Sequence, residues 1–589
     1  MTAVLGISAY HGDASATLVV DGQLAAAVQE ERFTRIKHWA GFPGESIRSC
    51  LAMAGLTADD VDYFAVGRDP RANVWKKALF AVRERPSLRL LSDRLRSGRR
   101  VGDAAGAMAL TLGVDRERVA PRMRWVEHHP SHLASAFFVS PFEEAAVCAI
   151  DGFGDFVSTS WATGRGPTLA LLRRVRFPHS LGIVYLAVTQ YLGFPRYGDE
   201  YKVMGLAAYG QPDYADRLRR LLALRPGGGF ELDLSYFRHW SSGVSMTWDG
   251  GEPCLGPVYT EKLEGLLGPA RKPDDQLEPR HEAIAASLQM VFEEAVFHVL
   301  NALYRRAPTP RLCLAGGCAM NSVMNGKIRE RTPFQEVFVQ PAAGDDGTAV
   351  GAAFSVWHEA LGGRRDFVME HGYWGPAFGE TDVRTALGAR QADLDRARCT
   401  VRAVDDEAEL IRWTAERIAE KKIVGWFQGR MEWGARALGN RSILADPRHA
   451  DMRRIINAKI KFREAFRPFA PSILEEALDA YFVGAGADPF MVRVHPIRPE
   501  KRDVIPAVTH VDGTGRVHTV TRRANPLYWQ LIKAFEALTG VPVLLNTSFN
   551  ENEPIVHRPE EALACFLRTG MDVLVLGRTV VVKEDPQAP

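Results

Sequence analysis

Two histidines and two aspartates, far apart in the chain, are suited to bind one metal ion. His128 and His132 stand four residues apart, so on a helix their imidazoles share one face. Asp151 and Asp345 each follow an apolar, strand-like run, and acids at the carboxyl ends of strands in an α/β fold lie where ligands gather. Two imidazoles with carboxylates suit iron(II) or another borderline divalent ion, and zinc is an alternative. We therefore expect a metal site made of these four residues.

Residues next to the predicted metal ligands affect the expected local geometry and the choice of ligand. Pro130 separates the two histidines, and proline is tolerated only in the first helical turn. We expect the helix to begin at His128, with His129 in extended geometry because it precedes the proline. Asp346 stands beside Asp345. The glycine and helix that follow favour Asp345 as the ligand and place Asp346 nearer a nucleotide.

Bulk properties exclude several classes of protein. A chain of 589 residues exceeds what one hydrophobic core supports, so we expect at least two domains. The formal net charge of +2 gives no general reason to expect nucleic acid as a partner. No apolar run approaches the roughly 20 residues that span a bilayer, and the N-terminus lacks the features of a secretory signal. We expect a cytoplasmic protein without a membrane partner. Its seven cysteines contain no Cys-x-x-Cys pair, which argues against disulfides and thiolate zinc.

The order of predicted elements indicates a duplicated nucleotide-binding fold. Residues 4–28 show strand, turn, strand and a second turn, and residues 145–162 repeat strand, Gly/Asp turn and strand. Residues 282–304 have the apolar spacing of a long core helix. Between the copies, the basic stretch 71–100 is best interpreted as a solvated helical face; an acceptor-binding wall and a partner surface are the alternatives.

Two short segments could contact a nucleotide. Gly316 and Gly317 end an apolar run, and glycines in a strand-to-helix turn allow close approach of a phosphate or adenosine. Lys202 could bind a phosphate or pair with Glu200 on a surface. The residues alone leave both options open.

The C-terminal part carries an unusual set of arginines. Arg436 and Arg467 alternate with glycine, tryptophan, phenylalanine and proline instead of following helical spacing. Guanidinium groups bind phosphate through paired donors. The pattern favours a cradle for a polyanion such as ATP with a second phosphate.

Taken together, these motifs resemble the O-carbamoyltransferase family named after NodU and CmcH, which includes antibiotic-modifying members such as the tobramycin enzyme. The resemblance runs nearly end to end, and its segments are 13–15, 30–33, 128–132, 151–152, 202–206, 315–321, 345–347, 436–442, 466–471 and 546–550.

The resemblance implies an α/β protein of two domains. Residues 1–365 would form an actin-like ATPase domain (ASKHA, TsaD-like) with two lobes, residues 366–399 a linker, and residues 400–589 a YrdC-like α/β domain. The second domain would use carbamoyl phosphate and ATP to form carbamoyl adenylate, releasing phosphate and pyrophosphate. The first would transfer the carbamoyl group to a hydroxyl of a small-molecule natural product, such as an antibiotic or other secondary metabolite. AMP is a good leaving group, which compensates for the poor electrophilicity of a carbamoyl group.

The resemblance also assigns residues by position. The metal ligands would be His128, His132, Asp151 and Asp345, with Fe²⁺ as the ion. Adenylate contacts would come from Gly152, Lys202, Met204, Gly205, Gly316, Gly317 and Asn321. Carbamoyl phosphate and ATP, the latter with Mg²⁺, would be held by Arg436, Lys461, Arg467, Arg516, Asn546 and Ser548. The catalytic residues would be His11, Asp13 and Lys202. The family has a histidine directly before the Asp-Ala-Ser motif; here Gly12 takes that position, and His11, one residue earlier, is the candidate general base.

Three other functions are compatible with parts of this pattern. A tRNA threonylcarbamoyl transferase uses related domains, although a near-neutral chain with both domains fused fits a small-molecule acceptor better. An actin-like sugar or acetate kinase would need neither the histidine pair nor the arginine-rich domain. A chaperone-like ATPase would leave residues 546–550 unexplained. The acceptor alcohol stays open among macrolides, aminoglycosides, ansamycins and nucleosides, and a homodimer is a further option.

Overall fold

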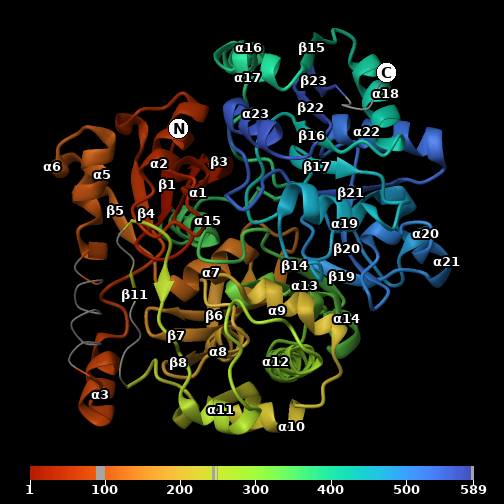
Figure 1. Cartoon of the computed structure of the whole chain (residues 1–589). Coiled ribbons are helices and arrows are strands. Elements are labelled where there is room, and N and C mark those ends of the chain that lie inside the picture. The colour runs from red at the N-terminus through yellow and green to blue at the C-terminus, as the bar shows by residue number, and fades with distance from the viewer. Residues whose placement is uncertain (88–97, 99, 242–245, 248–249, 585–589) are drawn as a thin grey trace. The chain divides into compact units, whose positions relative to one another are not determined.

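The chain folds into two compact units, Met1–Met369 and Glu370–Pro589 (Figure 1). The structure is a computed structural model that describes residues 1–87, 98, 100–241, 246–247 and 250–584. The division falls inside the stretch 366–399 that was expected as a linker. Most of that stretch belongs to the second unit and includes two helices, α16 (Glu380–Ala389) and α17 (Gln391–Arg396).

Unit 1, residues 1–369, contains two five-stranded sheets. The first has the order β3-β2-β1-β4-β5 and consists of β1 (Ala3–Ser8), β2 (Ser15–Val20), β3 (Gln23–Gln29), β4 (Tyr63–Val66) and β5 (Met123–Trp125). The second has the order β14-β13-β6-β7-β8 and consists of β6 (Glu144–Gly154), β7 (Val157–Arg165), β8 (Thr168–Arg176), β13 (Arg311–Ala315) and β14 (Glu336–Val339).

The two sheets have the same topology. In each, three consecutive strands pair antiparallel, and two later strands continue the sheet parallel to the first of the three. This identity confirms the predicted duplication and the two-lobed α/β architecture of the actin-like class. It also brings the carboxyl ends of β6 and β14, and the short helices after β5 and β14, toward one region.

Two helices lie between the sheets, α7 (His128–Phe137) and α15 (Gly347–Ser355) (Figure 1). Helix α7 contacts β6, β7 and β13, α15 contacts β1, β2 and β4, and the two helices contact each other. A Cβ atom on Gly351 would lie 1.7 Å from the carbonyl oxygen of Ser131, so only glycine permits this approach. The close packing fixes the starts of both helices beside each other.

The second lobe of unit 1 is covered by α8 (Leu181–Tyr191), α9 (Glu200–Leu206) and the long helix α12 (Pro279–Arg306). Helix α12 confirms the predicted core helix. Among the described residues it alone is long and apolar enough to cross a membrane, but 83% of its apolar window is buried. That burial is typical of a core helix.

Unit 2, residues 370–589, is built on one mixed sheet. Its order is β15-β23-β22-β16-β17-β21-β18-β20-β19, from β15 (Cys399–Ala403), β16 (Val424–Phe427), β17 (Arg441–Ala445), β18 (Ala470–Leu474), β19 (Arg493–Pro496), β20 (Thr514–Val520), β21 (Val543–Ser548), β22 (Val573–Leu576) and β23 (Thr579–Lys583). Helices α18 (Glu407–Ala419) and α22 (Pro526–Thr539) pack against each other, and α23 (Pro559–Arg568) packs on β16 and β22. Buried aliphatic residues of the sheet and these helices form one core, which makes unit 2 a separate α/β domain.

Candidate active site

Helix α7 positions the two histidines of the predicted metal site. It begins at His128 after the N-cap Glu127, and Oδ2 of Asp155 accepts the backbone N–H of His128 at 3.0 Å. Pro130 lies in the first turn, where its missing N–H needs no partner. The expectation of extended geometry at His129 is wrong, because His129 is helical. Its buried ring donates to a carbonyl of β7 at 3.0 Å, and this contact favours the helical position.

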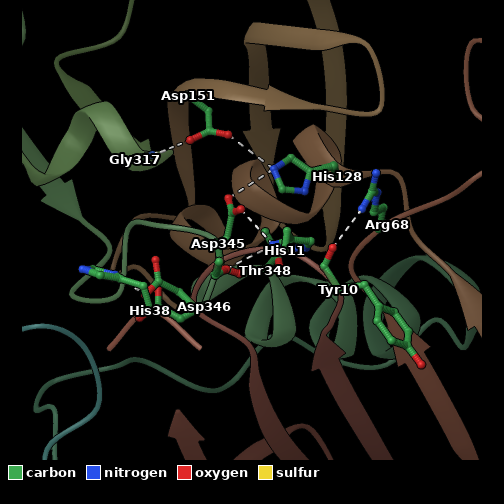
Figure 2. Close-up of polar contacts among 12 residues, drawn as sticks. Tyr10, His11, His38, Arg68, His128, Asp151, Gly317, Asp345, Asp346 and Thr348 are labelled. Atoms are coloured by element: carbon green, nitrogen blue, oxygen red, sulfur yellow. Dashed lines mark hydrogen bonds and ion pairs between the residues drawn. The ribbon is translucent and has the colours of Figure 1, made fainter. Parts of the chain in front are cut away.

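The four predicted ligands converge, and Figure 2 shows three of them, His128, Asp151 and Asp345. Nε2 of His128 and Nε2 of His132 are 3.1 Å apart, and each lies 3.4 Å from Oδ1 of Asp345. Oδ2 of Asp151 is 3.4 Å from the first nitrogen and 3.9 Å from the second. Adjacent ligands of one ion with bonds of about 2.1 Å stand roughly 3.0–3.4 Å apart. Two nitrogens and two oxygens at these separations fit a borderline divalent ion.

Asp345 and Asp346 point to different partners. Oδ2 of Asp345 pairs with Nδ1 of His11 at 2.8 Å, so this carboxylate joins His11 to the four-residue cluster. Thr348 donates its hydroxyl to the backbone carbonyl of Asp345 at 2.6 Å. In contrast, Oδ2 of Asp346 accepts from Nε2 of Gln29 at 2.6 Å. The structure therefore places Asp345, and not Asp346, among the convergent ligands.

The electrostatics of the cluster suit a cation. Burial alone would lower the pKa of His128, but Asp345 and Asp151 raise it to about 10. Burial and the charge of Asp345 would raise the pKa of Asp151. The neighbouring His128 and His132 have the larger combined effect and lower this pKa to about 2. The carboxylates thus favour a positive charge on the imidazole of His128. A divalent ion would replace that charge.

Next to the cluster, the turn after β1 carries two of the three predicted catalytic residues, His11 and Asp13. His11 is buried, and its Nε2 has no hydrogen-bond partner among the described residues. Asp13 Oδ1 lies 2.8 Å from Nδ1 of His38; burial would lower the pKa of His38, but Asp13 raises it to about 9. A Cβ atom on Gly12 would lie 2.7 Å from the hydroxyl oxygen of Tyr197. The tyrosine therefore fills the space that a side chain at position 12 would need.

Several predicted nucleotide contacts gather after β6 and β13. Gly316 has a φ of +88°, and a Cβ there would lie 2.2 Å from a carbonyl oxygen of β6, so glycine is required. The N–H of Gly317 donates to Oδ1 of Asp151 at 2.8 Å. Asn321 is buried and exchanges amide hydrogen bonds of 2.9 and 3.1 Å with a glutamine of α12. Gly152 lies at the end of β6 with open space where its Cβ would be. The glycines leave this edge accessible to a ligand.

Helix α9 carries the remaining predicted contacts of unit 1. Nζ of Lys202 pairs with Oδ1 of Asp199 at 2.8 Å. Residues two apart on a helix do not face each other, so the helical geometry of α9 does not favour the alternative pairing with Glu200, which stays a prediction. Burial raises the pKa of Glu200 to about 7. Met204 and Gly205 follow on the same helix.

Three arginines of the predicted cradle region lie near Arg516 in unit 2. Burial is the largest cause that lowers the pKa of Arg516. Nearby positive charges lower it further, those of Arg436, Arg463 and Arg467. Asp488 opposes this shift. Four guanidinium groups in one place repel each other, so a polyanion would stabilise the arrangement.

The buried Lys461 makes hydrogen bonds within the protein. It is 1% exposed, and its Nζ donates to the carbonyl of Ser548 at 2.6 Å, to the carbonyl of Asn550 at 2.7 Å and to Oδ1 of Asn550 at 2.6 Å. These acceptors use the three hydrogens of its ammonium. Lys461 thus holds the 548–550 turn in place. Asn546 is also buried, and its Nδ2 donates to the hydroxyl of Ser472 at 3.0 Å and to the carbonyl of Ala437 at 3.1 Å.

Three residues of these sites were not predicted from the sequence. Oε1 of Glu432 accepts backbone N–H bonds of 2.8, 2.8 and 3.0 Å from the loop 438–441, which shapes the segment after Arg436. His38 and Tyr197 lie beside the turn after β1. Glu432 stands inside the arginine-rich segment, which was a usable signal. His38 and Tyr197 belong to no recognisable spacing pattern.

Comparison with known proteins assigns the family. The carbamoyltransferase N-terminus model matches residues 3–354 and the carbamoyltransferase C-terminus model matches residues 415–583. An uncharacterized protein of Synechocystis sp. is 42% identical over 99% of this chain and 97% of its own length. The nodulation protein NolNO of Sinorhizobium fredii is 40% identical over 97% of this chain and 79% of its own length. Among solved structures, HypF of T. kodakarensis aligns with 60% of this chain and 46% of its own, at 16% identity and a TM-score of 0.29. The chain belongs to the carbamoyltransferase family, with the N-terminal family segment in unit 1 and the C-terminal segment in unit 2.

Proposed function

We propose that this protein is an ATP-dependent O-carbamoyltransferase that acts on a hydroxyl group of a small molecule. In unit 2, water cleaves carbamoyl phosphate to carbamate and inorganic phosphate. The carbamate oxygen then attacks the α-phosphorus of ATP, forming carbamoyl adenylate and expelling pyrophosphate. In unit 1, the acceptor oxygen attacks the carbamoyl carbon, and AMP leaves with the bonding electrons.

The observation that carries this proposal is the group of four arginines formed by Arg516 and the three whose charges act on it. A cluster of like charges inside a fold costs stability and is expected where a polyanion binds. ATP with carbamoyl phosphate presents several phosphate groups at once, and guanidinium groups match phosphate with paired donors. Lys461 supports the proposal because it holds the 548–550 turn in a fixed position. Asn546 supports it because it donates to the carbonyl of Ala437, the residue after Arg436.

Unit 1 supplies a second set of groups suited to carbamoyl transfer. His128, His132, Asp151 and Asp345 fit Fe²⁺, Zn²⁺ or a similar ion by donor type and spacing. Such an ion, when bound, would polarise a phosphate or carbonyl oxygen. Nδ1 of His11 faces the carboxylate of Asp345, so in the neutral imidazole Nδ1 carries the hydrogen. Nε2 is then the nitrogen with a free lone pair. We propose that this nitrogen is the general base that accepts the proton of the attacking alcohol.

A single incubation tests the proposed function. The protein with a divalent ion, ATP and ¹³C-labelled carbamoyl phosphate should yield labelled carbamoyl adenylate and pyrophosphate, both detected by mass spectrometry and ion chromatography. Omission of carbamoyl phosphate should abolish pyrophosphate release. A panel of aminoglycoside, macrolide, ansamycin and nucleoside alcohols should then identify an acceptor through a labelled carbamate ester. Formation of ADP with a phosphorylated alcohol would instead assign a kinase, and label transferred only to tRNA would assign a tRNA-modifying enzyme.

A further inference from the structure

Helix α3 (Val74–Glu84) presents its apolar face to solvent. At about 3.6 residues per turn, Val74, Trp75, Leu79 and Val82 lie on one side of the helix. Their exposed fractions are 55%, 67%, 56% and 75%. An amphipathic helix of a globular protein normally turns this side toward the core. Helix α3 lies within the basic stretch 71–100, and the solvated helical face expected there also carries these apolar residues. Arg89, Arg94, Arg96 and Arg99 of that stretch lie outside the described residues.

The opposite side of α3 is anchored to unit 1. The ring centroid of Phe80 lies 5.7 Å from that of Phe156 and 5.0 Å from that of Phe177. At the start of the helix, Nδ2 of Asn73 donates to Oε1 of Glu127 at 2.7 Å. These contacts fix the orientation of α3, so the fold itself turns the apolar side of the helix toward solvent. Figure 1 shows α3 outside the two sheets of unit 1.

Positive charge borders the apolar side on both flanks. Lys76 and Arg83 project on one flank and Lys77 on the other, by helical spacing. Besides desolvation, Arg176 and Arg174 of β8 lower the pKa of Lys76, which places further positive charge nearby. Arg174 is paired with Glu127, and Arg83 with the single acid of the helix, Glu84. Lysines and arginines beside an apolar strip can place their charges at the level of lipid headgroups while the strip enters the acyl region.

We propose that α3 docks unit 1 on a membrane surface that carries anionic lipids. Anionic headgroups complement the basic flanks, and a protruding row of large apolar side chains with a tryptophan suits an interfacial position. The sequence-based expectation of no membrane partner rested on the lack of a spanning segment, which does not bear on a helix lying in the surface. One short helix gives weak, reversible binding.

Co-sedimentation with vesicles tests this proposal in the full-length protein. Vesicles of phosphatidylcholine mixed with phosphatidylglycerol should retain the protein at low salt, and vesicles of phosphatidylcholine alone should not. High salt should release it, because screening weakens the attraction to headgroups. The triple variant Trp75→Ala/Leu79→Ala/Val82→Ala should bind at least about tenfold more weakly. Replacing Lys76, Lys77 and Arg83 by glutamine should weaken binding by about fivefold for each charge.

A matched control removes exposed apolar side chains elsewhere. Leu110 and Leu538 are 85% and 50% exposed, and the double variant Leu110→Ala/Leu538→Ala should bind anionic vesicles like the wild type. All variants should release pyrophosphate at the wild-type rate, which shows that they are folded. The proposal is overturned if the wild type does not bind anionic vesicles, or if the control variant loses as much binding as the α3 variant. Self-association that depends on α3, seen by sedimentation velocity without vesicle binding, would assign the surface to a second copy.

Discussion

Removal of Arg516 should stabilise the protein and abolish the proposed reaction at the same time. Its Nε is buried without a hydrogen-bond partner among the described residues, and Arg436, Arg463 and Arg467 add repulsion. A buried polar group without a partner costs about 1–3 kcal/mol. We therefore expect Arg516→Leu to raise the free energy of unfolding of the ligand-free protein by about 1–3 kcal/mol. Leucine is compatible with its position in strand β20.

The neighbouring strand offers a control with the opposite expected sign. Nε of Arg493, on β19, lies 3.6 Å from Oδ2 of Asp488, a carboxylate that is 1% exposed. Arg493→Leu removes the cation paired with that buried carboxylate, and breaking a buried ion pair costs up to about 3–5 kcal/mol. This variant should therefore be less stable than the wild type. Both substitutions remove one arginine from adjacent strands, so a change in net charge alone cannot explain opposite results.

Urea denaturation followed by tryptophan fluorescence, with and without ATP, measures these effects. ATP should stabilise the wild type more than Arg516→Leu, because ligand binding contributes to stability only where affinity is retained. Pyrophosphate release by Arg516→Leu should fall at least about a hundredfold, as expected when a charge-assisted phosphate contact is lost. A variant that is less stable than the wild type without ATP, or that keeps full pyrophosphate release, would refute the reasoning.

Three further predictions concern the metal cluster, the turn after β1 and the buried lysine. Asp345→Asn should lower the affinity for Fe²⁺ or Zn²⁺ at least about a hundredfold and Asp346→Asn by no more than about tenfold; elemental analysis after dialysis checks this, and the reverse order would contradict the ligand assignment. Because the pKa of His38 is raised to about 9, its pair with Asp13 contributes stability that is complete below pH 6.5 and lost as the pH rises through about 9. The difference in unfolding midpoint between wild type and Asp13→Asn should thus shrink between pH 7 and pH 10, and a constant difference would speak against the pair. Lys461→Met should destabilise the protein by about 3 kcal/mol, because its buried acceptors lose their donor; an unchanged urea midpoint would mean that the ammonium is not needed there.

The sequence predicted those parts of the site that depend on local spacing. The interval from His128 to His132 set both side chains on one helix face. The apolar runs before the two aspartates predicted that Asp151 lies near the end of β6 and that Asp345 follows β14. The hydrogen-bond partners of Lys461 could not be predicted from the sequence. Whether a lysine faces a ligand or a protein carbonyl depends on the path of a turn almost ninety residues later in the chain.

The contacts around Gly12 illustrate the same limit. A glycine before Asp13 is visible in the sequence, but the reason for it is Tyr197, which comes from the other lobe. Likewise, the basic stretch that contains α3 predicted a solvated helix, but it did not show that the outward side carries large apolar residues. Helical periodicity identifies two sides of a helix, and only tertiary contacts such as those of Phe80 decide which side is buried.

The central claim, that unit 2 activates a carbamoyl group on AMP, is tested most directly by isotope exchange. Labelled pyrophosphate should enter ATP only when carbamoyl phosphate is present, because exchange requires the reversible attack of carbamate on the α-phosphorus. Arg516→Leu should not support the exchange. Exchange that is independent of carbamoyl phosphate, or ATP consumption that yields ADP without any exchange, would contradict the account.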